Sequence, residues 1–284
     1  MVEKPVGSLP TDARRNAAPD ISSFRDTVYA YYSAHGREFP WRHTRDPYRI
    51  LVSEVMLQQT QTSRVVSKYV EFLCHFPNCA SLARATVADV LRVWHGMGYN
   101  RRALALRRVA QQVMELYDGR LPEDRDKLLD LPGVGPYTAS AVRAFAFNRP
   151  DAFIETNIRT VFIHHFFTGE DWVDDRDIMP FVTATVDKSN PRRWYEALMD
   201  YGAMLKETDN AARRSAHHRP QSRFAGSRRE ARGRLIGTLL ETGPTTQERL
   251  ESFIGQWDDL HEAALAALVR DGLVKKDRAT LSLD

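Results

Sequence analysis

The chain has 284 residues, of which 43% are hydrophobic and 27% are charged, and its formal net charge at pH 7 is +3. This composition is that of an ordinary soluble globular protein. Its longest apolar runs, at residues 144–147 and 161–167, are far too short to cross a bilayer, so a membrane protein is excluded. A net charge this small indicates nucleic-acid binding only weakly, so the positions of the basic residues matter more than their number.

The first half of the chain shows the spacing of helices. Residues 1–22 contain Pro, Gly, Asp and Arg without an apolar segment, so they predict a disordered lead and no signal peptide. From Ile21, apolar residues recur at helical intervals until Pro40. Further helices are predicted at residues 53–56, 65–76, 86–94 and 101–117. Because several alternating β-branched runs do not occur, the main body is predicted to be all-α.

The two cysteines, Cys74 and Cys79, lie in a stretch that we predict to be one helix. On a helix they point to different faces, which argues against a disulfide. Two thiols are also too few for a structural zinc site without help from His or Asp. We therefore expect half-buried free thiols in a reducing compartment, no metal, and a cytoplasmic location.

The composition changes after Lys206. Residues 207–234 carry eight arginines and almost nothing to pack, and residues 207–227 are therefore predicted to be a basic connector. Three short helical patterns follow, and the tail Gly272–Asp284 alternates as a two-stranded wing would. Three helices and a wing predict a winged-helix-like domain over residues 228–284.

The most distinctive local pattern is the segment Leu131–Val142, in which Gly133 and Gly135 flank Val134 and a helix of small residues follows at once. The amide hydrogens of such a turn converge at a helix N-terminus, where they bind an anion without a charged side chain. Between two helices, the turn grips a DNA phosphate without reading the base sequence. The residues on either side make an ordinary helix–turn–helix corner the weaker interpretation.

Six blocks of the chain, taken in order, resemble the helix-hairpin-helix DNA glycosylases, most of all the A/G-mismatch-specific adenine glycosylases. The blocks are Phe39–Arg42, Val52–Gln61, Gly96–Ala103, Leu131–Val142, Ile154–Val161 and Ala197–Ala203. The resemblance implies an all-α enzyme of two helical domains that flips a base out of duplex DNA and cleaves its bond to the sugar. Residues 23–45 and 152–206 would form one domain, and residues 46–151 a six-helix barrel domain that carries the hairpin.

The resemblance assigns the chemistry to three residues. Glu54 takes the position of the catalytic acid that protonates the purine ring nitrogen N7, and its apolar neighbours predict a raised pKa. Glu155 takes the position of the carboxylate that stabilises the sugar cation. The family usually has Asp there, which is also the better helix N-cap, so this chain departs by one methylene. Tyr137 stands where the bifunctional lyases carry their Schiff-base lysine, and a phenol cannot form that imine.

Further residues are assigned to the DNA by the same resemblance or by their charge. The residues expected to contact DNA are Gln59, Tyr99, Gly133, Val134, Gly135, Thr138, Arg213 and Arg214. The residues expected to line the base pocket are Arg37, Trp41, Arg42 and Asp200. Gln59 and Tyr99 would enter the helix and support the opposite strand, and Asp200 would meet an exocyclic amine. For Arg213 and Arg214 a solvated linker is an equal alternative, as a core position is for Trp41.

In most proteins of this family, four cysteines that hold an iron–sulfur cluster come after the last of these blocks. This chain has no cysteine after Cys79, so we expect no cluster and no other cofactor, and a monovalent cation at the hairpin remains open. The C-terminal domain that reads oxidised guanine in many adenine glycosylases is also missing, and the winged-helix-like domain stands in its place.

The sequence therefore predicts a monofunctional, monomeric glycosylase that acts on duplex DNA with a mispaired base, without membrane contact, in the cytoplasm at the nucleoid. Adenine opposite guanine or 8-oxoguanine is the expected target. A thymine or uracil mismatch glycosylase is the alternative among enzymes, because that branch shares the hairpin, Tyr137 and the two carboxylates. A non-catalytic DNA-binding protein is the alternative from another class. The replacement of Asp by Glu at position 155 and the absence of cluster cysteines favour a non-catalytic protein. The two retained carboxylates argue against one.

Overall fold

The structure is a computed structural model that describes residues 20–220 and 223–283. Most of the predicted disordered lead, residues 1–22, lies outside the described part. The chain forms two compact units, the first made of residues 20–38 with 148–219 and the second of residues 39–147 with 220–283. The domain boundaries expected near residues 45 and 152 stay predictions.

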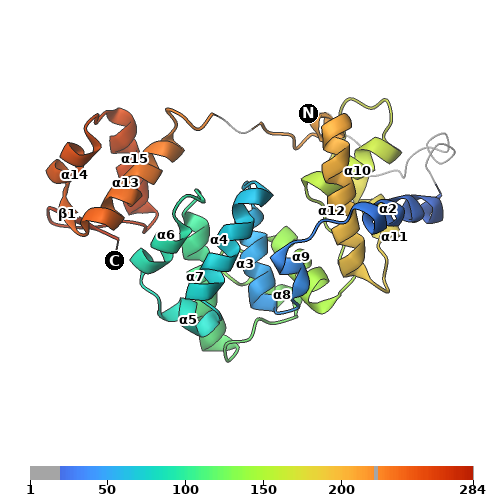
Figure 1. Ribbon diagram of the computed structural model, residues 1–284, viewed down its shortest axis with the longest axis horizontal. Coiled ribbons are helices and arrows are strands. Elements are labelled where there is room, and N and C mark those ends of the chain that lie inside the picture. The colour runs from blue at the N-terminus through green and yellow to red at the C-terminus, as the bar shows by residue number, and fades with distance from the viewer. Residues whose placement is uncertain (1–19, 221–222, 284) are drawn as a thin grey trace, which may run out of the picture. The chain divides into compact units, whose positions relative to one another are not determined.

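Helices from both ends of the first unit's sequence build its core (Figure 1). Its elements are α2 (Ile21–His35), α10 (Thr156–Phe166), α11 (Asp175–Thr185), α12 (Pro191–Thr208) and the 3-10 helix η2 (Ala211–Arg214). Phe24 of α2 is buried, and its ring lies 5.5 Å from that of Phe162 on α10 and 5.9 Å from that of Trp194 on α12. Aromatic pairs at these distances stabilise beyond their buried area. The cluster therefore holds α10 and α12 together.

The second unit begins with a group of helices around a central one. Its helical elements up to residue 147 are η1 (Pro40–His43), α3 (Pro47–Leu57), α4 (Thr62–His75), α5 (Cys79–Arg84), α6 (Val87–Trp94), α7 (Arg101–Leu116), α8 (Arg125–Leu129) and α9 (Pro136–Phe147). Asp46 caps α3 by accepting from the Tyr48 amide, and Pro47 occupies its first position. From Ile50 to Met56 every residue of α3 is buried, as expected of a helix with neighbours on all sides.

The C-terminal residues of the second unit form a winged-helix-like domain. Its elements are α13 (Arg228–Thr242), β1 (Thr245–Thr246), α14 (Gln247–Ile254), α15 (Asp259–Arg270), β2 (Lys275–Asp277) and β3 (Thr280–Ser282). The strands form an antiparallel sheet in the order β1-β3-β2, with Lys276 opposite Leu281. The Leu281 side chain is fully buried, because the alternating tail turns every second residue towards the helices. The predicted all-α body with a winged-helix-like C-terminal domain is confirmed.

The prediction that both cysteines lie in one helix is wrong. Helix α4 ends at His75, Pro77 follows, and Cys79 is the first residue of α5. Proline removes an amide donor and disfavours helical backbone at the residue before it, so the helical spacing is interrupted there. Cys74 is exposed and Cys79 is buried, and burial raises the pKa of the Cys79 thiol to about 12.

Half of the predicted basic connector is packed rather than extended. Ala211 and Ala212 of η2 are buried, and Ser215 pairs with Val173 in a parallel bridge. The Ala216 amide donates to the carbonyl oxygen of Val173 at 2.9 Å. Small residues between the arginines allow this close packing, which the count of charges did not reveal. The segment up to Arg219 belongs to the first unit.

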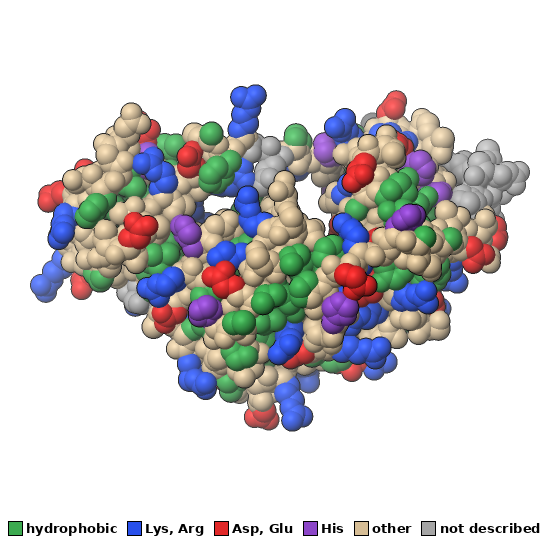
Figure 2. All heavy atoms as spheres, viewed as in Figure 1, with side chains coloured by type: hydrophobic (Ala, Val, Ile, Leu, Met, Phe, Trp, Pro, Cys, Tyr) green, Lys and Arg blue, Asp and Glu red, His purple; other side chains and the backbone are tan. Residues whose placement is uncertain are grey.

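Charges of both signs mix on the surface. On the face drawn in Figure 2, Lys and Arg side chains alternate with Asp and Glu over the helices instead of forming one basic field. Within the described residues, no helix is long and apolar enough to span a membrane.

Candidate active site

The structure brings Glu54 and Tyr137 together. Glu54 lies in the middle of α3, and Tyr137 lies in the first turn of α9. The Tyr137 hydroxyl donates a hydrogen bond of 2.8 Å to Glu54 Oε2. Glu54 is only 5% exposed, and a buried carboxyl is costly unless such partners satisfy it. Two of the three residues predicted as catalytic thus form one hydrogen-bonded pair.

The predicted hairpin joins α8 to α9. Gly133 has a φ of +81°, and a Cβ at this position would lie 2.9 Å from the Cβ of Ala105. Gly135 has open space around it and an ordinary φ. Of the two glycines, Gly133 is therefore the one that the turn requires.

Two other hairpin residues face the interior. Val134 is buried, and its amide donates to the carbonyl oxygen of Leu131 at 3.1 Å within the turn. Thr138 is 3% exposed, and its hydroxyl accepts a hydrogen bond of 3.3 Å from Gln58 Nε2. The Thr138 side chain thus holds the end of α3 against α9, and its contact with DNA stays a prediction.

Glu155 caps α10. Its Oε1 accepts from the amides of Asn157 at 2.7 Å and Ile158 at 2.9 Å, and its Oε2 accepts from Asn157 Nδ2 at 3.3 Å. A negative charge is favoured at this position, because unpaired amides and the helix dipole meet there. Glutamate is rarely an N-cap, but its extra methylene has not prevented this one from capping.

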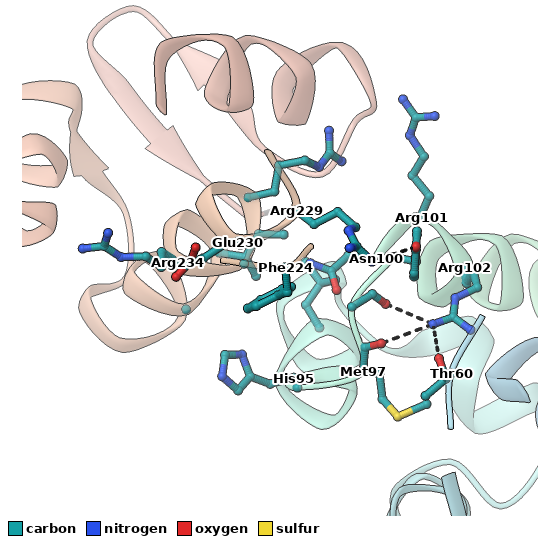
Figure 3. A pocket seen from close by; sticks show the side chains of 18 of the residues that line it. Thr60, His95, Met97, Asn100, Arg101, Arg102, Phe224, Arg229, Glu230 and Arg234 are labelled. Atoms are coloured by element: carbon teal, nitrogen blue, oxygen red, sulfur yellow. Dashed lines mark hydrogen bonds between the residues drawn. The ribbon is translucent and has the colours of Figure 1, made fainter. Parts of the chain in front are cut away.

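Gln59 and Tyr99 share an unusual backbone. Gln59 has a φ of +54° and Tyr99 a φ of +48°, and such values in residues other than glycine cluster at functional sites. Arg102 fixes both loops, since its guanidinium donates to the carbonyl oxygens of Val55, Met56 and Gln58 on one side and of Met97 and Gly98 on the other. Figure 3 shows this side chain between Met97 and Thr60. Burial lowers the pKa of Arg102 to about 10.

A cleft of about 1460 Å³ runs along these two loops and the start of the C-terminal domain. Gln59 and Tyr99 both line it, as does Arg229 of α13. Arg229 Nη1 donates to the Tyr99 hydroxyl at 3.0 Å, and its guanidinium lies 5.6 Å from the centre of the Tyr99 ring. Asp271 joins Arg101 of α7 to Arg232 of α13 by ion pairs. The C-terminal domain is thereby fixed beside Tyr99.

Arg37 and Asp200, both predicted for the base pocket, bind each other. Asp200 accepts from the Arg37 amide and from Arg37 Nε, each at 2.8 Å, and its side chain is almost fully buried. The carboxylate thus fixes the turn after α2. The pairing with Arg37 was not predicted from the sequence, and contact of Asp200 with an exocyclic amine stays a prediction.

Trp41 and Arg42 pack around Phe39. Trp41 is buried, stacks on Phe39 with ring centres 5.0 Å apart, and meets Tyr69 edge-on at 5.5 Å. Arg42 covers the Phe39 ring at 5.1 Å. Trp41 thus takes the core position that was the alternative to the pocket rim.

The two arginines predicted to hold phosphates differ. Arg213 is exposed, whereas Arg214 Nη1 donates to the carbonyl oxygens of Phe167 at 2.8 Å and Glu170 at 3.1 Å. Arg214 thus ties η2 to the end of α10, and of the two only Arg213 presents its charge to solvent.

The comparisons with known proteins cover the same residues. The profile of the HhH-GPD superfamily of base excision DNA repair proteins matches residues 52–180, a range that contains Glu54, Tyr137 and Glu155. An adenine DNA glycosylase of Mycolicibacterium smegmatis is 32% identical over 268 residues, which cover 88% of this chain and 92% of that protein. The chain belongs to the HhH-GPD superfamily. The match to the adenine DNA glycosylase of Mycolicibacterium smegmatis covers 88% of the chain, so it extends into the residues after Arg219.

Two further relatives are glycosylases named for thymine. A thymine/uracil-DNA glycosylase of Methanothermobacter thermautotrophicus is 35% identical over 147 residues, which cover 51% of this chain and 66% of that protein. The solved structure of a thermostable thymine-DNA glycosylase superposes with a TM-score of 0.60 at 30% identity, covering 68% of this chain and 89% of that one. The helical fold is therefore shared with a thymine-DNA glycosylase.

Sequence reasoning missed three residues that support the predicted ones. Arg102 fixes the loops of Gln59 and Tyr99, Arg229 holds the Tyr99 hydroxyl, and Asn157 holds Glu155. The adjacency of Asn157 to Glu155 was a usable signal, since a polar residue two positions after an N-cap can return to it. Among the residues that the structure describes, no three His, Cys, Asp or Glu side chains gather as metal ligands would.

Proposed function

We propose that this protein is a monofunctional DNA glycosylase that removes a mispaired base from duplex DNA, with adenine as its principal target. The observation that carries the proposal is the hydrogen bond of 2.8 Å between the Tyr137 hydroxyl and Glu54 Oε2 in a buried setting. Its membership of a superfamily of base excision repair proteins gives this pair its chemical meaning.

Glu54 is the proton donor of the proposed reaction. A general acid must carry a proton before the reaction starts, and apolar surroundings favour the neutral form of a carboxyl group. Glu54 lies between buried Val52 and Val55 on a helix that other elements enclose. Its proton passes to N7 of the purine, so that the base leaves the sugar as a neutral molecule.

Glu155 stabilises the positive charge that develops on the deoxyribose as the bond to the base breaks. The ionised carboxylate is the useful form here, and the amides at the start of α10 donate hydrogen bonds to it. Water then adds at the anomeric carbon and loses a proton, which leaves an abasic site. The two carboxyl groups therefore need opposite protonation states.

Tyr137 makes the proposed reaction hydrolytic. Lyase chemistry needs an amine that replaces the base at the sugar carbon, and a phenol offers no such nitrogen. In its place Tyr137 donates to the proposed acid. The strand is expected to remain intact after base release.

The relatives support adenine as the target base. Adenine DNA glycosylases match the chain over most of its length, whereas the thymine/uracil glycosylase matches only 51% of it. The higher identity over that shorter stretch keeps a thymine or uracil mismatch as the second candidate. Pocket shape decides between bases in enzymes that flip them.

The proposed partner is duplex DNA, bound by a monomer at the nucleoid without any cofactor. The turn at Gly133 supports phosphate binding, since it precedes the N-terminus of α9. Gln59 and Tyr99 support contact with the strand opposite the target base, because both line one cleft in strained conformations. A monovalent cation at the hairpin remains part of the proposal.

The test uses labelled duplexes that contain G:A, 8-oxoguanine:A, G:T or G:U, treated with alkali after incubation. Alkali-dependent cleavage at adenine is the expected result. Cleavage only at thymine or uracil would select the second candidate, and tight binding without cleavage of any duplex would select the non-catalytic protein.

A further inference from the structure

Lys206 is an ammonium group that neither the hairpin nor the Glu54 pair uses. It lies near the end of α12, half-buried, and its Nζ donates a hydrogen bond of 2.7 Å to Asn157 Oδ1 at the start of α10. Asn157 Nδ2 in turn donates to Glu155 Oε2. One side chain therefore links Lys206 to the carboxylate that caps α10.

The close approach of the two helices depends on Gly202. A Cβ at Gly202 would lie 2.3 Å from the carbonyl oxygen of Asn157, a distance that no real Cβ reaches. Lys206 follows four residues later, on the same side of α12. The glycine thus brings α12 against the first turn of α10, and the lysine reaches the same residue from the next turn.

The chemistry of the three groups fixes the orientation of the amide. An ammonium group only donates, an ionised carboxylate only accepts, and an asparagine amide has one end of each kind. Only the arrangement with Oδ1 towards Lys206 and Nδ2 towards Glu155 satisfies all three groups. Lys206 and Glu155 therefore favour the same orientation of the amide from its two ends.

Of the charged groups around Lys206, the Glu155 carboxylate has the largest effect on the pKa of Lys206. Burial, the largest influence, lowers the pKa of Lys206, whereas the Glu155 carboxylate raises it and Arg159 and Arg37 lower it further. Both arginines have anionic partners, because Arg159 binds Asp175 and Arg37 binds Asp200. His164 and Asp209, near the end of α10 and just after α12, pair with each other at 2.9 Å.

We propose that Lys206 is a positioning residue for Glu155: it holds the Asn157 amide that donates to the carboxylate at the start of α10. This inference rests on the proposed function, in which Glu155 stabilises the sugar cation. Lys206 touches Asn157 and not the reacting atoms, so its effect is exerted through Glu155.

The first experiment measures the coupling without any activity. The ammonium of Lys206 is titrated by NMR in the wild-type protein and in Glu155→Gln. Since the Glu155 charge raises the pKa of Lys206, its removal should lower that pKa. An identical titration in both proteins would overturn the inference, whatever the enzyme does.

The second experiment follows single-turnover base release against pH for Lys206→Met, Lys206→Gln and Lys206→Arg. Lys206→Met should slow release about 10- to 100-fold at neutral pH, because a displaced catalytic group loses that much. Its acidic limb should move to higher pH, because one positive charge beside this site is removed. Lys206→Gln should show the same shift with a smaller rate loss, and Lys206→Arg should restore the limb.

Lys188→Met is the matched control, because Lys188 is exposed and belongs to the same unit. It should leave both the rate and the limb unchanged. If the wild-type enzyme is active and the acidic limb of Lys206→Met does not move, the inference about Lys206 is overturned but the proposed function is not. Absence of base release by the wild-type protein would overturn the proposed function, while the NMR titration would still decide the coupling.

Discussion

The two carboxyl groups of the proposed chemistry stand in opposite environments. Glu54 is in the middle of a helix buried on all sides, where a phenol is its hydrogen-bond donor. Glu155 is the residue before a helix, where two backbone amides and an amide backed by an ammonium face it. The first site is enclosed by other helices and the second lies at a helix N-terminus, so the fold gives two residues of one type different surroundings.

The largest effect is expected from Glu54→Gln. A glutamine amide cannot give a proton to a leaving base, so base release should fall at least about 1000-fold, in the upper range of general-acid contributions. Duplex affinity should remain within about tenfold, because Glu54 is buried and not a phosphate ligand. Single-turnover assays and equilibrium binding check both.

Glu115→Gln is the control for this variant, because Glu115 is exposed on α7. It should release the base at the wild-type rate. Wild-type turnover by Glu54→Gln would remove Glu54 from the mechanism and leave Glu155 as the only functional carboxylate.

Gly202→Ala is expected to disturb the surroundings of Glu155 and not those of Glu54. The added methyl group would meet backbone atoms of Asn157, so the variant should lose about 2–3 kcal/mol of stability. Base release should slow because α10 must shift. Gly233→Ala is the matched control, since that helical glycine of α13 has open space and alanine favours helix. Equal unfolding midpoints for the two variants would contradict the packing argument.

Tyr137→Lys replaces the phenol that donates to Glu54 with an amine. The lysine should confer a modest amount of borohydride-trappable adduct, because an amine then stands where the lyases of this family carry theirs. The wild-type enzyme and Tyr137→Phe should give almost none. Trapping of the wild-type protein at the rate of base release would show that another amine reaches the sugar, and the hydrolytic mechanism would have to be abandoned.

The smallest effect concerns the arginines after α12. Replacing Arg213 and Arg219 with alanine should reduce the salt dependence of duplex binding by about two units of slope at most, if each contacts one phosphate. Both side chains are exposed. Arg214→Ala should instead lower the unfolding temperature, since Arg214 binds two carbonyl oxygens. An unchanged slope in the double variant would show that these charges are merely solvated.

The local pattern of the sequence was enough for much of the fold. Helix α6 begins after the predicted Thr86 cap, and the tail forms the predicted wing, because caps and alternation depend on neighbouring residues alone. The buried position of Glu54 was also predictable, since its neighbours in sequence are apolar. The cysteines were misplaced where Pro77 interrupts a helical spacing that otherwise continues.

Partners distant in the chain were decided only by the tertiary structure. Arg37 binds Asp200 across more than 160 residues, and Lys206 reaches Asn157 across nearly fifty. A charge in a sequence carries no sign of the partner that will neutralise it, so Asp200 looked like a pocket wall and Arg214 like a phosphate ligand. The sequence by itself predicted which residues would carry the chemistry, because residue type sets what a group can donate or accept. The structure decided which of them are held ready, because only packing brings Gly202 and Lys206 of one helix against the first turn of another.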